Sequence, residues 1–229
     1  SKRVYLVKGP VKAQQIKIVN GGQGSELQIK GSDDTIKMKQ VERFTEHKDE
    51  TDESIIREIL DSYGFQKVVN METQLSNDDK NHKKVQNQDD LTFIKQIASE
   101  NGVFIWMEYD ENGEEIVHVS SLPLDSKPSA TLTMNAGVNE KNNIDDLSIN
   151  WDADAPTETV GKKVDAKRKQ IIEVDIPEAP QTPLGDVSLH DLTKGSECFQ
   201  NVKPPSHRPV DDDARGQQRS KAALNEAQW

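Results

Sequence analysis

The chain of 229 residues has little of what marks several large classes of protein. A single cysteine, Cys198, excludes an internal disulfide framework and a cysteine-rich zinc site. The longest apolar run is five residues, 103–107, which is far too short to span a bilayer. No apolar segment follows the N-terminus, so the sequence shows no secretory signal. Aromatic residues make up only 5%, which leaves few large side chains to fill a thick core.

Positive charge is also in deficit. Lys and Arg number 29 against 40 Asp and Glu, which gives a net charge of −11. This balance argues against a general nucleic-acid binder, because affinity for phosphate needs clustered Lys and Arg. A hydrophobic content of 33% is too high for wholesale disorder and low for one thick-cored enzyme domain. We therefore expect thin layers, small barrels or a fold that depends on a partner.

The first 45 residues combine short β-type runs with turn residues, which predicts a β domain. The expected strands cover residues 4–7, 15–19, 27–29 and 36–38. A glycine-rich stretch at residues 20–24 could suggest a phosphate loop, but no helix start or Gly-Lys-Ser follows it. It is therefore interpreted as a hairpin turn. The chain lacks an initial Met and opens directly into a strand-like segment, so we expect its natural start to lie upstream.

Residues 46–122 predict a small α+β domain of two helices and a hairpin. Thr51 or Asp52 can cap the first helix, and Gly64 can terminate it. Its apolar face would consist of Ile55, Ile56, Ile59, Leu60 and Tyr63. After strand-like Val68 and Val69, residues 76–88 contain almost no apolar residue and predict a surface loop.

The second helix repeats the pattern of the first. Asp89 or Asp90 can cap it, and the pair Asn101 and Gly102 ends it. Its apolar face would consist of Leu91, Ile94, Ile97 and Ala98. Asn112-Gly113 between the β-prone runs 103–109 and 115–119 then predicts a hairpin.

Pro123 and Pro128 mark a boundary. Residues 123–176 predict strands at 131–134, 147–151 and 170–176. The basic stretch 160–169 could contact an acidic partner, but an exposed hairpin edge protected by lysines is the favoured interpretation. Residues 177–210 are proline-rich and predict a long connection, and residues 211–229 predict a helix. Because the apolar face of that helix is thin, we expect it to pack on something outside this chain.

No residue pattern indicates a catalyst. No two of the five histidines stand at metal-ligand spacing, and Val119 occupies the position where a calcium loop starting at residue 108 would need its bidentate Glu. His118 lies in a strand pattern that suggests an exposed or half-buried face. The adjacent acidic pairs lie in turns or helix starts, where we expect both carboxylates to be solvated, unlike a catalytic dyad. The sequence therefore names no catalytic, cofactor-binding or metal-binding residue, and we expect no enzyme and no cofactor.

Several motifs nevertheless occur in a known order. Residues 87–106 are similar to the segment s-D-l-x-F-l-x-x-l-A-x-x-x-G of contractile-tail hub proteins, and residues 51–65 are similar to their t-x-x-d-I-x-x-x-I-A-x-x-y-G-l. The turn at residues 31–34 fits as well, as do residues 147–152 followed by Val160-Gly-Lys-Lys. Over residues 25–175 the chain thus resembles the late control protein D family of tailed phages and the hub half of type VI secretion spike proteins.

The resemblance implies an α+β, mainly β, fold with two small tube-type β-barrel domains and an inserted unit of two helices and a hairpin. The first barrel, in residues 1–45, would be incomplete at its N-terminus, and the second would use residues 123–176. The resemblance further implies a structural baseplate hub, a virion component that forms a homotrimeric ring. This ring would join the hexameric tail tube protein to the trimeric central spike protein, with baseplate wedge proteins as further candidate partners.

On this interpretation the protein is located in a virion tail baseplate or an injection particle, after assembly in the bacterial cytoplasm. It would have no specific nucleic-acid binding and no membrane insertion. Two other functions stay open. One is a stand-alone carbohydrate- or protein-binding β module, which should expose aromatic platforms, although Trp106 and Trp151 lie in strand patterns that suit a core. The other is a cell-wall hydrolase that uses acidic residues.

Overall fold

The structure is a computed structural model. It describes residues 5, 7–72, 75–77, 83–123, 131–134, 142–148, 158–159, 161–165, 168–174, 202–203 and 213–227. The fold is α+β, as expected. The sheets within these residues have two or three strands, and none of them closes into a barrel. No helix in the described part of the chain is long and apolar enough to cross a membrane.

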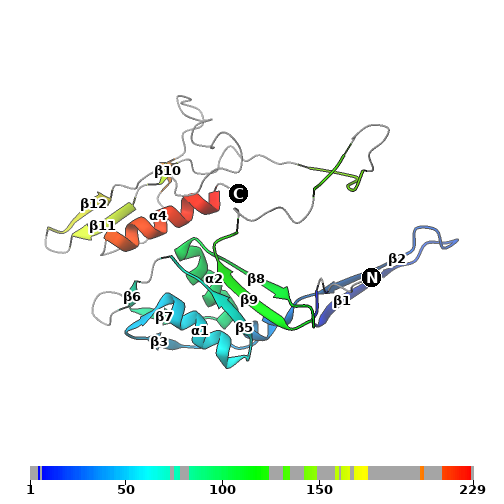
Figure 1. The fold of residues 1–229 in the computed structure, drawn as a ribbon, viewed down its shortest axis with the longest axis horizontal. Coiled ribbons are helices and arrows are strands. Elements are labelled where there is room, and N and C mark those ends of the chain that lie inside the picture. The colour runs from blue at the N-terminus through cyan, green and yellow to red at the C-terminus, as the bar shows by residue number, and fades with distance from the viewer. Residues whose placement is uncertain are drawn as a thin grey trace.

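The centre of the fold is the predicted unit of two helices and a hairpin (Figure 1). Helices α1 (Asp52–Ser62) and α2 (Asp90–Asn101) accompany a sheet of β5 (Gln66–Val69), β8 (Phe104–Tyr109) and β9 (Glu115–Ser120). The strand order is β5-β9-β8, with β5 parallel and β8 antiparallel to β9.

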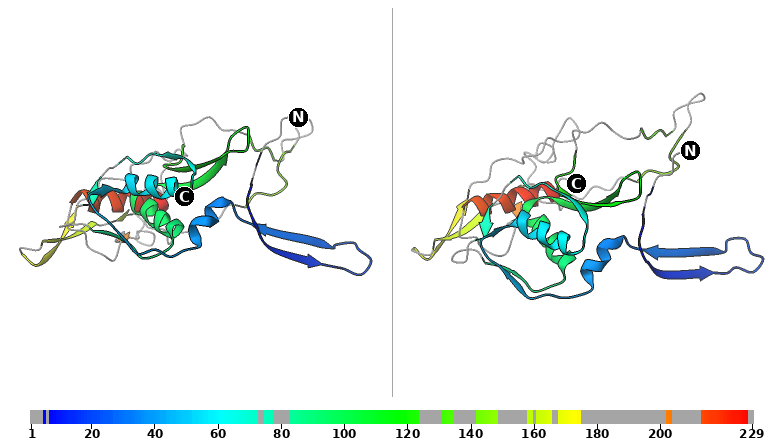
Figure 2. Two further views of the ribbon diagram at one scale, coloured as in Figure 1. Left: turned by 90° about the horizontal axis from the view of Figure 1, so that it is seen from below. Right: turned by 60° about the horizontal axis from the view of Figure 1, so that its bottom comes forward.

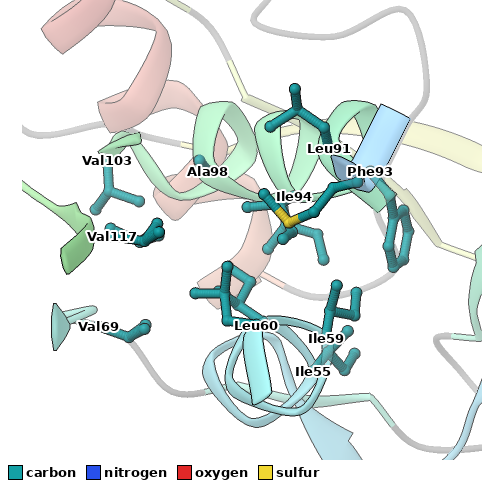
Figure 3. Packing of buried hydrophobic residues seen from close by; sticks show 14 of the residues in the cluster. Ile55, Ile59, Leu60, Val69, Leu91, Phe93, Ile94, Ala98, Val103 and Val117 are labelled. Carbon is teal, nitrogen blue, oxygen red and sulfur yellow. The ribbon is translucent and has the colours of Figure 1, made fainter. Parts of the chain in front are cut away.

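The buried core joins the two helices to one face of this sheet. Figure 3 shows Ile59 and Leu60 of α1 pointing toward Ile94 of α2, with Val69 and Val117 of the sheet beside them. The apolar faces predicted for both helices are buried, except that Tyr63 is only partly buried. Phe93, which the helical pattern omitted, is also buried, at 1% exposure.

The helix ends follow the sequence signals. The side chains of Thr51 and Asp89 accept hydrogen bonds from the backbone N–H groups of Ser54 and Thr92, three residues further on. Beyond the helices, Gly64 and Gly102 adopt positive φ angles of 73° and 67°, a conformation that glycine enters without steric cost.

The strand predicted at residues 36–38 is wrong. These residues belong to the 3₁₀-helix η1 (Asp34–Lys39), because the side chain of Asp33 accepts the N–H of Thr35 and starts a helical turn. Met38 lies on the buried side of η1 and is fully inaccessible. Local capping therefore outweighs the β-prone composition here.

The surface loop predicted at residues 76–88 is also wrong where the structure describes it. Strands β6 (Ser76–Asn77) and β7 (Lys84–Gln86) pair with β4 (Glu50–Thr51) and β3 (Thr45–His47), respectively. The side chains of Asn77 and Gln86 are 2% exposed. Their polarity is compensated by hydrogen bonds to other buried groups, which composition alone does not reveal.

Before this unit, β1 (Val11–Lys17) and β2 (Glu26–Gly31) form an antiparallel hairpin that projects from the body of the molecule (Figures 1 and 2). We call residues 11–31 the arm. Its glycine-rich tip is the predicted hairpin turn, in which the N–H of Gly22 binds the carbonyl oxygen of Val19. Tyr5 and Val7 are not in a strand, and the other residues of the strand predicted at 4–7 lie outside the description.

The C-terminal helix α4 (Asp213–Ala227) packs on α2, which corrects the expectation that it packs outside this chain. Ala222 and Leu224 are nearly buried, and Gly102 makes room for Ala222 because it has no Cβ. Near α4, β11 (Gly161–Asp165) and β12 (Gln170–Val174) form the predicted basic hairpin. Strands β10 (Glu158–Thr159) and β13 (Val202–Lys203) pair in parallel.

Two of the strands predicted for the second half of the chain are absent where the structure describes them. Residues 131–134 are not a strand, and neither are residues 147–148 of the strand predicted at 147–151. The remainder of that strand lies outside the described residues, as do most of the proline-rich connection, Cys198, Trp151 and Trp229.

Candidate functional site

The arm is the first candidate surface, because its two faces differ in character. In an antiparallel pair, directly opposed residues lie on the same face, and alternate residues share that face. The pairs Gln14–Ile29 and Ile16–Leu27 therefore form one face, and Ala13–Lys30, Gln15–Gln28 and Lys17–Glu26 form the other. One face of the arm is thus largely apolar, and the other is polar and charged.

The apolar face of the arm is in solvent. Ile16, Leu27 and Ile29 are 67%, 60% and 56% exposed. Ile18, the next residue of the alternation, is 83% exposed. Every residue of β1 and β2 is exposed, and within the described residues these strands form a sheet of two. An isolated two-stranded hairpin is at best marginally stable in water, so a contact on this face would stabilise the arm.

The root of the arm is held firmly against the body. The hydroxyl of Tyr109 accepts the N–H of Lys8 and donates to the Lys8 carbonyl oxygen, both at 3.0 Å. Gly9 passes so close to the chain at Ser32 that a Cβ would collide with the Ser32 carbonyl oxygen. The N–H of Ser32 in turn donates to the carbonyl oxygen of Pro10. The Tyr109 contacts join the root of the arm to the end of β8, and the contacts at Ser32 hold the two ends of the arm together.

The arm also differs from the remainder of the chain in charge. Residues 11–31 contain three lysines and one glutamate, a net charge of +2. The other 208 residues therefore carry −13 of the total charge of −11. Lys17 and Lys30 lie on the polar face, so the positive charge and the apolar surface of the arm point in opposite directions.

A second candidate is a buried polar cluster, which we call the Asp52 cluster. The carboxylate of Asp52 accepts hydrogen bonds from Asn77 and Asn101 at 3.0 and 2.9 Å, and Lys84 Nζ lies 3.3 Å from it. Lys84 also binds Glu100 at 2.8 Å. The Asp52 cluster therefore ties α1, β6, β7 and α2 together.

Helix α4 is attached to the same region through polar contacts. Arg215 donates to the carbonyl oxygen of Ser76 at 2.6 Å, Arg219 lies 3.4 Å from Glu100, and Gln218 donates to Asn101. The cluster thus extends from the central unit to the C-terminal helix.

The electrostatics of the Asp52 cluster favour structure over proton transfer. Burial acts to raise the pKa of Asp52, but the charge of Lys84 and the hydrogen bonds from Asn77 and Asn101 together lower it. The pKa of Glu100 is lowered in the same way, against burial, mainly by Lys84. A general acid or base near neutral pH needs a pKa moved toward 7. Both carboxylates are moved away from it.

A third group surrounds Asp90. Its carboxylate accepts hydrogen bonds from Tyr63 at 2.7 Å and Gln86 at 2.6 Å, and Arg43 Nε lies 2.9 Å from it. Every partner comes from a different element or loop. This group therefore attaches the start of α2 to the end of α1, to β7 and to the loop that carries Arg43.

The expectation that acidic residues in turns and helix starts are solvated is therefore wrong for two of them. Asp52 and Asp90 stand at helix starts, yet both are buried. Asp89 is different: its carboxylate caps α2, where burial acts to raise its pKa but hydrogen bonds from Thr92 lower it.

The outer face of the sheet carries an aromatic pair. The rings of Trp106 and His118 stack with centroids 5.0 Å apart, and the Trp106 indole N–H donates to Glu108. His118 is half-buried, in agreement with its strand pattern. Trp106 is only partly buried and is not part of the core, contrary to expectation. His118 covers one ring face of Trp106, so that face offers no platform for a sugar.

A cavity of about 200 Å³ lies between α2, the start of β8 and α4. It is lined mostly by apolar groups, among them Ala98, Val103, Ile105 and Ala222, together with Lys95 and Ser99. Ligand pockets usually measure about 300–1,000 Å³ and bring several polar groups together. This cavity is smaller than that range, its lining is mostly apolar, and no residue of the Asp52 cluster lines it.

No group of three or more metal-ligating side chains occurs among the described residues. His47 is buried and stacks on Phe93, with its Nδ1 3.7 Å from Glu50. The histidines at 82, 190 and 207 lie outside the described residues.

Sequence reasoning missed the residues that build the root of the arm and the Asp52 cluster. Asn77 lies in the stretch interpreted as a loop, and buried amides have the same composition signal as exposed ones. Gly9-Pro10 is typical of a turn, but the sequence did not show that Gly9 approaches Ser32, 23 residues further on. Tyr109 carried no signal, because its role depends on a contact with Lys8, about a hundred residues away.

Fold and site together define a small mixed α+β protein whose most distinctive surface is a projecting, cationic hairpin. The chain belongs to the family described as Alg8 N-terminal domain, whose model matches residues 1–206. This is a different family model from the one that the hub resemblance indicated. Comparison with curated proteins gives no match.

Among solved structures, the fold is similar to that of two tail proteins. One is the tail protein from Neisseria meningitidis MC58, with a TM-score of 0.59 and 18% identity over 96% of this chain. The other is the 43 kDa tail protein of prophage MuSo2 from Shewanella oneidensis, with a TM-score of 0.53 and 11% identity over 97% of this chain. The chain spans 60% of the length of each of these tail proteins. At these identities the likeness shows a shared fold.

Proposed function

We propose that this protein is a structural subunit of a phage-type tail or a related contractile injection machine. Within such a machine it acts as a baseplate hub. The observation that carries the proposal is the fold shared with the Neisseria tail protein over 96% of the chain. The ordered hub motifs at residues 51–65 and 87–106 supply independent support, because they form the capped helices α1 and α2 of that fold.

In the proposed role, three chains form a ring that joins the hexameric tail tube to the trimeric central spike. The arm and the β11–β12 hairpin would belong to two tube-type β-barrel domains, on either side of the inserted α+β unit. The partners would be the tail tube protein, the spike protein and baseplate wedge proteins. The protein would be located in a virion tail baseplate or injection particle.

The surface chemistry supports assembly over catalysis. The buried carboxylates have lowered pKa values and serve as structural anchors, and the described cavity is small. Six of the sixteen large hydrophobic residues that are exposed among the described residues lie on the projecting arm. We therefore propose a non-enzymatic role without a cofactor, and expect no turnover of peptidoglycan or simple glycosides. Measurable hydrolysis by the purified chain would favour the cell-wall hydrolase instead.

Solution mass tests the proposed ring. Light scattering after gel filtration, over a range of concentrations, should give a particle near three times 25.7 kDa, about 77 kDa. Most homo-oligomers are two-fold dimers, so a trimer would be a specific result. A particle of 25.7 kDa at every concentration would contradict the ring.

A further inference from the structure

We propose that Asn20, at the tip of the arm, is a site of spontaneous deamidation, in which the backbone nitrogen of Gly21 attacks the Asn20 side chain. The inference is independent of the proposed function, because it rests on the chemistry and geometry of the arm tip. It assigns a covalent modification to one of three places in the chain that look alike in the sequence.

The sequence contains three Asn-Gly pairs, at residues 20–21, 101–102 and 112–113. The reaction needs the backbone nitrogen of the second residue to reach the side-chain carbonyl carbon of the Asn. Glycine favours this approach because it has no Cβ to hinder it and permits many backbone angles. The three pairs should therefore react alike in an unfolded chain, and the folded structure decides which of them reacts.

The reaction balances with water as the only co-reactant. The Gly21 nitrogen loses its proton and bonds to Cγ of Asn20, the bond from Cγ to Nδ2 breaks, and ammonia leaves a five-membered succinimide ring. Water then adds to one of the two ring carbonyl carbons next to the nitrogen and breaks its bond to that nitrogen. The product is aspartate or isoaspartate at position 20, and nothing is oxidised or reduced.

At the tip of the arm, neither reacting group is engaged (Figure 2). Asn20 and Gly21 are exposed, and within the described residues no hydrogen bond involves the Asn20 side chain or the Gly21 N–H. The hydrogen bonds of the tip lie on either side, from the Gly22 N–H to the carbonyl oxygen of Val19 at 2.9 Å and from the Val19 N–H to Ser25 Oγ at 3.1 Å. No atom lies within 4 Å of the position that a Cβ on Gly21 would take. The two groups can therefore meet without losing a hydrogen bond of their own.

The second pair is held at the end of α2. Asn101 Nδ2 donates to Asp52 at 2.9 Å and to the carbonyl oxygen of Ile97 at 2.8 Å. The attacking nitrogen is engaged as well, since the Gly102 N–H donates to the carbonyl oxygen of Ser99 at 3.2 Å. Attack at this pair would have to break hydrogen bonds on both reacting groups.

The third pair is held in the turn between β8 and β9. Asn112 Nδ2 lies 3.3 Å from the carboxylate of Asp110, and the Gly113 N–H donates to the Asp110 carbonyl oxygen at 3.1 Å. Gly113 is buried, and a Cβ on it would lie 3.0 Å from the ring of Tyr5. The attacking nitrogen of this pair is therefore both bonded and covered.

Deamidation of Asn20 changes the arm in two ways. The new carboxylate carries a negative charge, so the net charge of the arm falls from +2 to +1. Isoaspartate also places one extra methylene in the main chain between β1 and β2. Modified chains should therefore separate from unmodified chains as a more acidic species in ion-exchange chromatography.

Peptide mapping by mass spectrometry tests the selectivity. The folded full chain is incubated at mildly alkaline pH in water enriched in ¹⁸O, so that each deamidation during the incubation places a labelled oxygen in the product. We expect Asn20 to react about tenfold faster, or more, than Asn101 and Asn112, because each of these must first lose a hydrogen bond. Equal rates at the three residues of the folded chain would overturn the proposal.

Two controls separate the fold from the local sequence. In guanidinium chloride the three pairs should react at similar rates, and an Asn20 that keeps its full advantage there would show that the fold is not the cause. The variant Asn20→Gln keeps an exposed amide but would have to close a six-membered ring, so the acidic species should disappear while thermal unfolding stays unchanged. If this variant forms the acidic species at the wild-type rate, the site lies elsewhere and the assignment is wrong.

Discussion

At the scale of single residues, the structure separates two kinds of acidic side chain that look identical in the sequence. Glu58 lies exposed on α1, whereas Asp52, at the start of the same helix, is buried and bound to Asn77, Asn101 and Lys84. Burial makes an unpaired carboxylate energetically costly, so the charge of Asp52 depends on these three partners.

Replacing Asp52 with Asn should lower the free energy of unfolding at pH 7 by about 2–3 kcal/mol, because Lys84 loses one of its two carboxylate partners inside the protein. Urea unfolding followed by circular dichroism measures the change. Glu58→Gln, at an exposed position of α1, is the control and should change the stability by less than about 0.5 kcal/mol. If the two substitutions lower the free energy of unfolding equally, the structural role of the Asp52 cluster is wrong.

The same pair of variants gives a pH signature. The pKa values of Asp52 and Glu100 are lower in the folded protein than their ordinary values. Their stabilisation is therefore complete above the unfolded-state pKa, near 4, and is lost as the pH falls through the folded-state values. Asp52→Asn should unfold less steeply than the wild type as the pH falls below about 4.

At the scale of elements, residue spacing was sufficient to predict a helix where one segment contains its own cap, apolar face and terminating residue. For α1 and α2, the cap, the apolar face and the terminating glycine agree, and the structure confirms each of them. The same reasoning failed at residues 36–38 and 76–88. In these segments a side-chain cap and partners distant in sequence decide the conformation.

The buried helix faces can be tested by inserting a charge. Ile97→Asp and Ile59→Asp should each lower the free energy of unfolding by about 4 kcal/mol or more, because each places an unpaired carboxylate in the core. Loss of the far-ultraviolet helical signal and of a cooperative melt would show this. Lys95→Asp on the exposed side of α2 is the control and should melt like the wild type. Unchanged melting of the two core variants would contradict the described faces.

The docking of α4 can be tested at a matched pair of glycines. Gly64 and Gly102 have similar positive φ angles, but only at Gly102 would a new Cβ meet another element, 2.9 Å from the Cα of Ala222. Gly64→Ala should cost about 1 kcal/mol from backbone strain. Gly102→Ala should cost about 1 kcal/mol more, since it also pushes α4 away.

Hydrogen exchange locates this second effect. Amide protons of α4 should exchange faster in Gly102→Ala and at the wild-type rate in Gly64→Ala. If the two variants lose the same stability and α4 exchange is unchanged in both, the close approach of α4 to α2 is not important for docking.

At the scale of the whole molecule, net charge and shape determine how copies of the chain can associate. A chain with a charge of −11 repels its own copies, so association needs a local region of opposite sign. The arm, with a net charge of +2, and the basic hairpin of β11 and β12 are two such regions, and the arm also carries an exposed apolar face. The expected trimer mass of about 77 kDa is a prediction at this scale, because a ring depends on how whole chains contact one another.

The sequence by itself determined the α+β class, the two capped helices and the β8–β9 and β11–β12 hairpins, because their signals are local in the chain. It also contained the alternation that makes one face of the arm apolar. Only the tertiary structure decided that Asn77 and Gln86 are buried, that α4 packs on α2, and that the arm stands free of the body. These properties depend on contacts between residues far apart in the chain, and a residue's type does not state which partner compensates its burial.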